Sequence, residues 1–114
     1  MRKIYIAAPW ELRDHAIGVM DKLERRGHVV TSRWLKVMLE GGHETAVLDL
    51  ADVARADILL LINTPEWLRR GSGGRHVEFG YALALGHELV VLGTRSNLFH
   101  DMNHVRFIES PEML

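Results

Sequence analysis

The sequence predicts an α/β fold in which a single doubly wound sheet of about five mostly parallel strands is flanked by helices. Short apolar segments alternate along the chain with longer segments whose apolar residues recur at helical spacing, which is the pattern of successive β-α-β units. One apolar run, residues 58–62 (ILLLI), has no polar interruption. Such a run is typical of a central parallel strand that is covered on both faces.

The first strand and the first helix follow from their local pattern. After Lys3, residues 4–7 are apolar, with one Tyr and two Ile, so residues 3–7 predict a strand that Pro9 ends. Residues 11–26 are expected to form a helix that Gly27 terminates. Its helical spacing places one set of apolar residues on a single face: Leu12, Ala16, Val19, Met20 and Leu23.

The following segments continue the alternation. Residues 28–32 (HVVTS) predict a second strand, residues 33–40 a short helix, and residues 44–56 a second clear helix. The apolar stripe of this last helix is expected along Val47, Leu48, Ala51 and either Ala54 or Arg55. The remaining elements are expected to be the central strand over 57–63, a loop over 63–74, a helix over 75–85, a strand over 88–92, a loop or short helix over 93–103, a strand over 105–108, and a turn into a last piece of helix over 110–112.

Ligands of doubly wound sheets bind outside the carboxyl ends of the strands. In a flavodoxin-like or Rossmann-like sheet, that rule selects residues 7–11, 63–74 and 93–100. Ala7 and Trp10 are therefore candidate substrate-binding residues. Trp10 could stack on a base, and it is equally suited to the core.

Length and composition indicate one domain and a small ligand. The chain has 114 residues, which suits a single domain over residues 1–114, and 47% of them are apolar. A formal net charge of -1 gives little attraction to a nucleic-acid backbone. The sequence has no Cys, no signal-peptide pattern and no apolar run of membrane-spanning length, which favours a cytoplasmic protein without a membrane partner.

The most informative stretch is glycine-rich, residues 71–86 (GSGGRHVEFGYALALG). Backbone N–H groups in such a loop, together with the start of the following helix, can bind a phosphate. The stretch is not a dinucleotide-binding fingerprint, because His76 stands where G-x-G-x-x-G requires its third glycine. It is not a P-loop, because no Gly-Lys-Ser/Thr follows. The glycines alone are equally consistent with an ordinary turn.

Glu78 lies in the predicted first turn of this helix, at the edge of the sheet where a ligand is expected. The helix dipole would keep a carboxylate there ionised, so Glu78 is a candidate catalytic residue. The alternative is a local role, in which Glu78 complements the helix dipole or pairs with Arg75 three residues earlier.

Further candidates come from acidic, aromatic and histidine residues. Asp49 and Asp52 are three residues apart on one side of a helix, and spacing alone does not choose between them. Tyr5 lies on the first strand, where a buried phenol needs a hydrogen-bond partner. His100 and His104 have i, i+4 spacing but lack a third ligand, so no metal is expected.

At these residues the sequence resembles the nucleoside 2-deoxyribosyltransferase family and the related 2'-deoxynucleoside 5'-phosphate N-hydrolases. The resemblance runs through most of the chain and rests on residues 4–10 (IYIAAPW), residues 49–61 (DLADVARADILLL) and, most specifically, residues 77–86 (VEFGYALALG). It implies a nucleoside deoxyribosyltransferase-like domain. In that family Glu78 matches the nucleophile that attacks C1' of the sugar, and Asp49 matches the acid that helps the base depart. Tyr5 matches the phenol that orients the nucleophile.

The resemblance also implies substrate-binding residues. Ser72, with Gly73 and Gly74, matches the position that holds the 5' end of the substrate, where the transferases have Asp and the phosphate N-hydrolases have Ser. The Ser therefore favours a nucleotide. Asn97 resembles a residue that one subunit of a dimer lends to the site of its neighbour.

The resemblance implies cleavage of the N-glycosidic bond of 2'-deoxynucleosides or their 5'-monophosphates through a covalent deoxyribosyl-glutamate intermediate. The sugar then passes to another nucleobase or to water, and no cofactor is required, because two carboxylates suffice for this chemistry. Two alternatives stay open: a non-catalytic nucleotide-binding or sensing module, and an NAD-type N-glycosidase on a related fold. A homodimer is also expected, because Trp34, Trp67 and Leu68 supply apolar area that one subunit would leave exposed.

Overall fold

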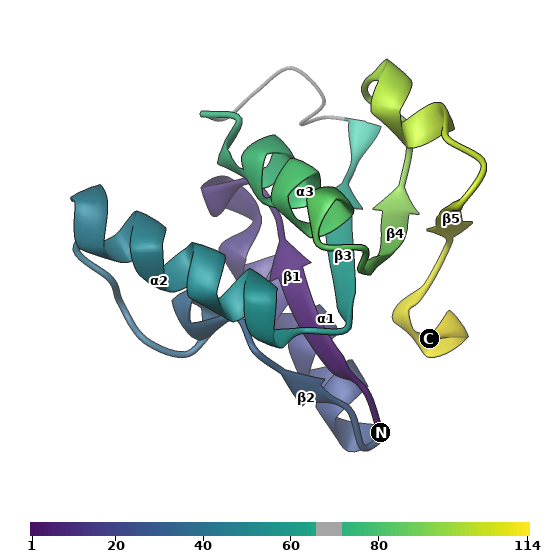
Figure 1. Ribbon diagram of the computed structural model, residues 1–114. Coiled ribbons are helices and arrows are strands. Elements are labelled where there is room, and N and C mark those ends of the chain that lie inside the picture. Colours follow the sequence, from purple (N-terminus) through teal and green to yellow (C-terminus); the bar gives the residue numbers. More distant parts are fainter. Residues whose placement is uncertain (66–71) are drawn as a thin grey trace.

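A parallel β-sheet runs through the middle of the molecule (Figure 1). The structure is a computed structural model, and it describes residues 1–65 and 72–114. The strands are β1 (Lys3–Ala7), β2 (Val29–Val30), β3 (Ile58–Asn63), β4 (Glu88–Gly93) and β5 (Val105–Ile108). Their order in the sheet is β2-β1-β3-β4-β5, and each neighbouring pair is parallel. The predicted doubly wound α/β sheet is confirmed.

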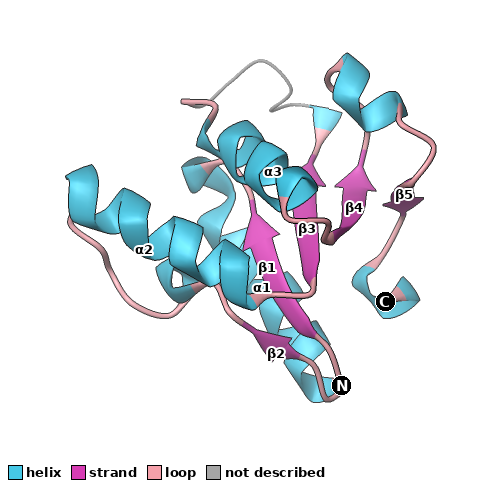
Figure 2. Cartoon of the chain, viewed as in Figure 1, coloured by secondary structure: helices cyan, strands magenta, loops and turns pink. Residues whose placement is uncertain are grey.

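Helices cover both faces of the sheet. Helix α1 (Arg13–Arg25) lies on one face, and α2 (Gly42–Arg55) and α3 (Gly74–Ala84) lie side by side on the other (Figure 2). The helices change sides because the chain moves outward from β1 to β2 and then reverses across the sheet to β3. In such folds the strands at the reversal, here β1 and β3, border the ligand site with their carboxyl ends.

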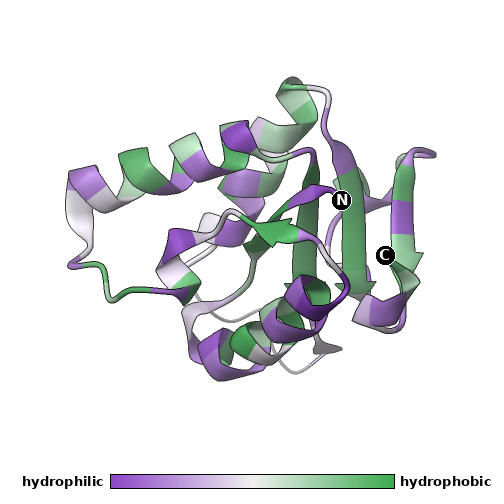
Figure 3. Cartoon of the chain, turned by 90° about the horizontal axis from the view of Figure 1, so that it is seen from below, coloured by the Kyte–Doolittle hydropathy of each residue, from purple (hydrophilic) through white to green (hydrophobic). Residues whose placement is uncertain are grey.

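The core is built from the central strands. Every residue of β3 is buried, and so is every residue of β1 except Lys3. Figure 3 shows the central strands as a hydrophobic layer between helices of mixed polarity. Helices on both sides thus account for the uninterrupted apolar sequence of β3.

The second strand is shorter than predicted, since it covers residues 29–30 rather than 28–32. The strand stops because a side chain replaces its backbone in the pairing with β1. The Ile6 backbone N–H donates to the Ser32 hydroxyl at 2.6 Å, whereas in a continued strand it would donate to a backbone carbonyl. The predicted short helix over 33–40 is reduced to one 3-10 turn, η2 (Arg33–Leu35). The first helix also begins later than predicted, because residues 10–12 form the separate turn η1 (Trp10–Leu12).

The predicted apolar stripe of α2 is wrong. Val47 is 52% exposed, and Ala51, Ala54 and Arg55 also face solvent, whereas the buried residues of α2 are Asp52 and Val53. The helix is turned so that an acidic side chain faces inward, because Asp52 finds arginine partners there. The inward side of this helix thus combines a paired acid with Val53 in place of a continuous apolar stripe.

The remaining elements agree with the sequence prediction to within about a residue or fall within the expected segments. Residues 93–103 hold a short 3-10 helix, η4 (Leu98–Asp101), and the tail ends in another, η5 (Pro111–Met113). Trp67 and Leu68 lie outside the described residues. Within residues 1–65 and 72–114, no helix is long and apolar enough to cross a membrane.

Gly93 provides a test of the packing at the carboxyl end of β4. Its φ of +123° is unfavourable for other residues, and an added Cβ would lie 2.3 Å from the backbone oxygen of Asn63. We expect Gly93→Ala to lower the free energy of unfolding by about 2 kcal/mol or more. Urea denaturation followed by circular dichroism measures the change.

The matched control is Gly18→Ala on α1, where an added Cβ meets nothing within 4 Å. This substitution should raise the free energy of unfolding by about 0.5–1 kcal/mol, because Ala favours a helix interior over Gly. Equal effects of the two substitutions would contradict the close approach of β4 to β3 at Gly93.

Candidate active site

A cavity of about 340 Å³ lies beside the carboxyl end of β1, between α2, α3 and the segment that follows β2. Two carboxylic acids line it from different elements, Asp49 from α2 and Glu78 from α3. Trp10 and Trp34 form part of its wall. The cavity therefore lies where the strand-end rule predicts a ligand and brings together groups far apart in the chain.

Glu78 is joined to Tyr5 across 73 residues of sequence. The Tyr5 hydroxyl donates a hydrogen bond of 2.5 Å to Glu78 Oε2. Tyr5 is fully buried in β1, so its phenol has the partner that its position requires. Burial and the nearby Glu78 charge raise the pKa of Tyr5 far above its ordinary value, and the phenol remains the donor.

Burial governs the ionisation of Glu78. Loss of water raises the pKa of Glu78 to about 7; the Tyr5 hydrogen bond opposes this rise, and the charge of Asp49 adds to it. Burial therefore has more effect on the pKa of Glu78 than the helix dipole on which the sequence prediction relied. Glu78 is the fifth residue of α3, beyond the first turn where the dipole acts most strongly. Near neutral pH this carboxyl can be a base or a nucleophile.

The structure separates the two aspartates of α2. Asp49 is half-buried and lines the cavity, and its buried Oδ1 has no hydrogen-bond partner among the described residues. Burial, followed by the negative charge of Asp52, raises the pKa of Asp49 to about 6, and Arg33 opposes the rise. Asp52 is fully buried in ion pairs with Arg33 and Arg55. Of the two, Asp49 is the acid that can reach a ligand.

Trp34 is buried, whereas the sequence analysis expected it to leave apolar area exposed. It is 8% exposed, and its indole Nε1 donates a hydrogen bond of 2.9 Å to the backbone oxygen of Ile6. Trp10 is 54% exposed, with its ring 6.2 Å from that of Trp34 and the Arg13 guanidinium 5.6 Å from its centroid. Trp34 is therefore a fixed wall of the cavity within its own subunit, and Trp10 is the more exposed of the two rings.

The glycine-rich segment reaches the cavity at Ser72, Gly74 and Arg75. Gly73 turns the chain into α3 with a φ of 85° and is not one of the lining residues. Arg75 is 4% exposed, and burial lowers its pKa while Glu11 raises it. One side of the cavity thus combines a hydroxyl, a helix start and a buried guanidinium, a set that suits an anion.

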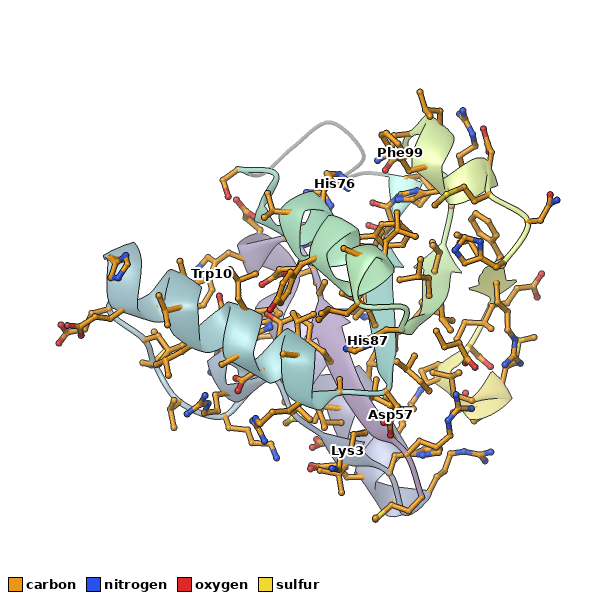
Figure 4. All side chains as sticks on the ribbon, viewed as in Figure 1. Lys3, Trp10, Asp57, His76, His87 and Phe99 are labelled. Carbon is orange, nitrogen blue, oxygen red and sulfur yellow. The ribbon has the colours of Figure 1, made fainter. Side chains whose placement is uncertain are left out.

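Two of the predicted residues, Ala7 and Asn97, do not line this cavity. Ala7 is fully buried as the last residue of β1, and Ala8 lines the cavity in its place. Asn97 lines a different cavity of about 340 Å³ between α3 and η4, and its Oδ1 accepts a hydrogen bond from Phe99 N. Asp57 Oδ2 accepts from Lys3 N at the amino end of the sheet, far from Trp10 (Figure 4).

No metal centre is found in the part of the chain that the structure describes, where no three His, Asp or Glu residues are arranged to hold an ion. His100 is instead buried, with its ring against Phe79 and its Nδ1 accepting a hydrogen bond from Ser96 N.

Sequence reasoning missed one wall of the cavity. It is formed by the irregular segment before α2 and by the first turn of that helix, where the lining residues are Leu39, Glu40, Gly41 and Thr45. These residues carry no periodicity and match no motif, so no sequence signal identified them.

The comparisons with known proteins show the fold. No protein-family model matches the sequence, and no curated protein matches it significantly. Among solved structures, the chain is similar to the CMP N-glycosidase BcmB of Clostridium botulinum, with a TM-score of 0.68 and 17% identity over 97% of this chain and 92% of that one. It is also similar to a 2-desoxiribosyltransferase from Leishmania mexicana, with a TM-score of 0.67 and 17% identity over 96% of this chain and 76% of that one.

Tyr5→Phe tests the coupling between Tyr5 and Glu78. Removing the hydroxyl removes the hydrogen bond that favours ionised Glu78, so the pKa of Glu78 should rise above its value of about 7. Carbon-13 NMR of the glutamate side-chain carboxyl measures this pKa directly. The matched control is Tyr81→Phe, at the exposed tyrosine of α3. A Glu78 midpoint that stays put or falls in Tyr5→Phe would contradict the coupling.

Proposed function

We propose that this chain cleaves the N-glycosidic bond of a 2'-deoxynucleoside or its 5'-monophosphate, with Glu78 as the nucleophile and Asp49 as the general acid. The observation that carries the proposal is the placement of two cavity-lining carboxyls with raised pKa values, one of them held by a buried tyrosine. The names of the two structural neighbours, a CMP N-glycosidase and a 2-desoxiribosyltransferase, denote chemistry at the same kind of bond.

In the first step a carboxylate oxygen of Glu78 attacks C1' of the sugar. The bond between C1' and the base nitrogen breaks, its electron pair goes to the base, and Asp49 gives a proton to the base. Tyr5 holds the attacking carboxylate in one orientation through its hydrogen bond. In the second step water or another base attacks C1' and gives its proton to the ionised Asp49, and the Glu78 carboxylate leaves. Water gives hydrolysis, and a base gives transfer.

The substrate class that we favour is a 5'-monophosphate. Ser72, the start of α3 at Gly74 and the buried guanidinium of Arg75 share one side of the cavity, and a phosphate is the part of a nucleotide that suits such a set.

We also propose that a second subunit completes the site. Asn97 lies outside the cavity of its own chain, next to Leu98 and Phe99, which are 66% and 54% exposed. An exposed apolar pair of this kind is suited to a subunit contact, from which Asn97 would reach the neighbouring cavity.

Glu78→Gln tests the nucleophile. It should lower the rate of base release from deoxynucleosides and their 5'-monophosphates by about 1,000-fold or more, because the amide is not nucleophilic. Chromatography of the free base gives the rate. Glu88→Gln, on a surface ion pair with Arg2, is the matched control and should leave the rate unchanged.

Mass spectrometry of the wild-type protein after brief exposure to deoxynucleotides should show a sugar attached at Glu78. Undiminished base release by Glu78→Gln would overturn the assignment of the nucleophile. Tight nucleotide binding with no turnover in the wild type would instead favour a non-catalytic binding module. Release of nicotinamide from NAD alone would favour the other class of N-glycosidase.

The pH dependence of kcat/KM is expected to be a narrow bell with its maximum between pH 6 and 7. The reacting form needs an ionised Glu78 and a protonated Asp49. Because the pKa is about 7 for Glu78 and about 6 for Asp49, this is the less populated of the two singly protonated forms of the pair, which prevail between those values. As the pH falls below this range, Glu78 takes up a proton and the nucleophile is lost. As it rises above the range, Asp49 loses its proton and the acid is lost. A rate that climbs steadily to pH 9 would argue against Asp49 as the acid.

A further inference from the structure

Asp52 lies one helical turn after Asp49 and is held in a network of hydrogen bonds. It is 0% exposed, and its carboxylate accepts from Arg33 N at 3.0 Å and from Arg33 Nε at 3.0 Å. Its ion pairs with Arg33 Nη2 and Arg55 Nη2 measure 2.8 and 2.7 Å. Burial alone would raise the pKa of Asp52, but the hydrogen bonds from the two arginines lower it overall. Asp52 is therefore a fixed negative charge that does not line the cavity.

The same network fixes α2 against the strand that carries Tyr5. Thr31 Oγ1 donates to the backbone oxygen of Asp52 at 2.9 Å, and Ser32 Oγ accepts from Ile6 N. The indole of Trp34 donates to the backbone oxygen of the same Ile6. Residues 31–34 thus tie α2 to β1 through consecutive contacts. The position of α2, and with it that of Asp49, is set relative to Tyr5 by this tie.

Charged and titratable groups face Asp49 from four elements. Asp52 lies on the same helix, Arg33 on η2, Tyr5 on β1 and Glu78 on α3. The phenol of Tyr5 is neutral, so Asp52 and ionised Glu78 oppose a charge on Asp49 and Arg33 favours one. The Arg33 side chain is 43% exposed, whereas that of Asp52 is 0% exposed, so solvent screens Arg33 more strongly.

We propose that the Asp52–Arg33 ion pair controls the proton on Asp49. The fixed negative charge of Asp52 favours the protonated form of Asp49, and that proton is the one given to the departing base. Asp52 does not touch the substrate, and it acts through Asp49. This inference rests on the proposed function, because it explains how Asp49 can be the acid. Arg33 supplies the anchor that keeps Asp52 charged and limits the effect of that charge.

Opposite substitutions at the two partners test this device. The titration midpoint of the Asp49 carboxyl, followed by carbon-13 NMR and assigned by the signal lost in Asp49→Asn, should shift to lower pH in Asp52→Asn. It should shift to higher pH in Arg33→Gln, because Arg55 still holds Asp52 ionised. A general loosening of the fold would not move the midpoint in opposite directions.

Arg55→Gln is the matched control. It breaks an ion pair with the same carboxylate, at 2.7 Å, but Arg55 lies six residues after Asp49, almost two turns further along α2. The Asp49 midpoint should therefore stay unchanged in this variant. Arg33→Lys keeps the positive charge and should return the midpoint towards the wild-type value. If Asp52→Asn does not fold, the Asp49 midpoints of the three arginine variants still test the inference: only Arg33→Gln should raise the midpoint, and Arg33→Lys and Arg55→Gln should not.

Activity provides the second readout. In Asp52→Asn the loss of kcat should be larger at pH 8 than at pH 6, because Asp49 gives up its proton at lower pH, and KM should change little. An Asp49 midpoint that is the same in Asp52→Asn and Arg33→Gln, or that moves in one direction in both, would overturn the inference. Absence of base release by the wild type would overturn the proposed function instead, and the NMR titration would still decide the role of Asp52.

Discussion

The hydrogen bond between the Tyr5 hydroxyl and the Glu78 carboxylate is the contact on which the site depends. It joins the first strand to the third helix, so the Glu78 carboxyl can have one position only if β1 and α3 are packed correctly. A carboxyl in a site with little water resists ionisation, and a phenol that remains protonated is a donor that compensates for the lost hydration. The sheet supplies the rigid support for this pair, since Tyr5 belongs to a strand whose neighbours on both sides are parallel.

Much of the fold could be predicted from the sequence because the apolar patterns of β3 and α1 indicate which of their faces are buried. The run of residues 58–62 permits only a strand with cover on both faces, and α1 buries four of the five residues predicted for its apolar face: Ala16, Val19, Met20 and Leu23. Helix α2 could not be predicted in the same way. Its inward side chain is Asp52, whose partner Arg33 is 19 residues earlier, and no periodicity reveals a charge pair of that separation.

The candidate site was predictable to a similar degree. The strand-end rule located the cavity, and Glu78 was identified by its place after a glycine-rich loop. The choice between Asp49 and Asp52 came from the family resemblance, because both lie on the same side of the helix and only the position of Arg33 and Arg55 distinguishes them. Trp34 was wrongly expected to leave apolar area exposed. Its hydrogen bond to the backbone of Ile6 is a tertiary contact that no local sequence pattern indicates.

The two sides of the cavity differ in how strongly the fold constrains them. Glu78, Tyr5 and Asp49 belong to regular elements, whereas Leu39, Glu40 and Gly41 belong to an irregular segment that contributes little to the core. Substitutions in that segment can reshape this wall of the cavity without moving a strand or a helix. Evolution can therefore change the shape of this cavity through a few surface substitutions, while Glu78, Tyr5 and Asp49 stay under the much stricter demands of packing.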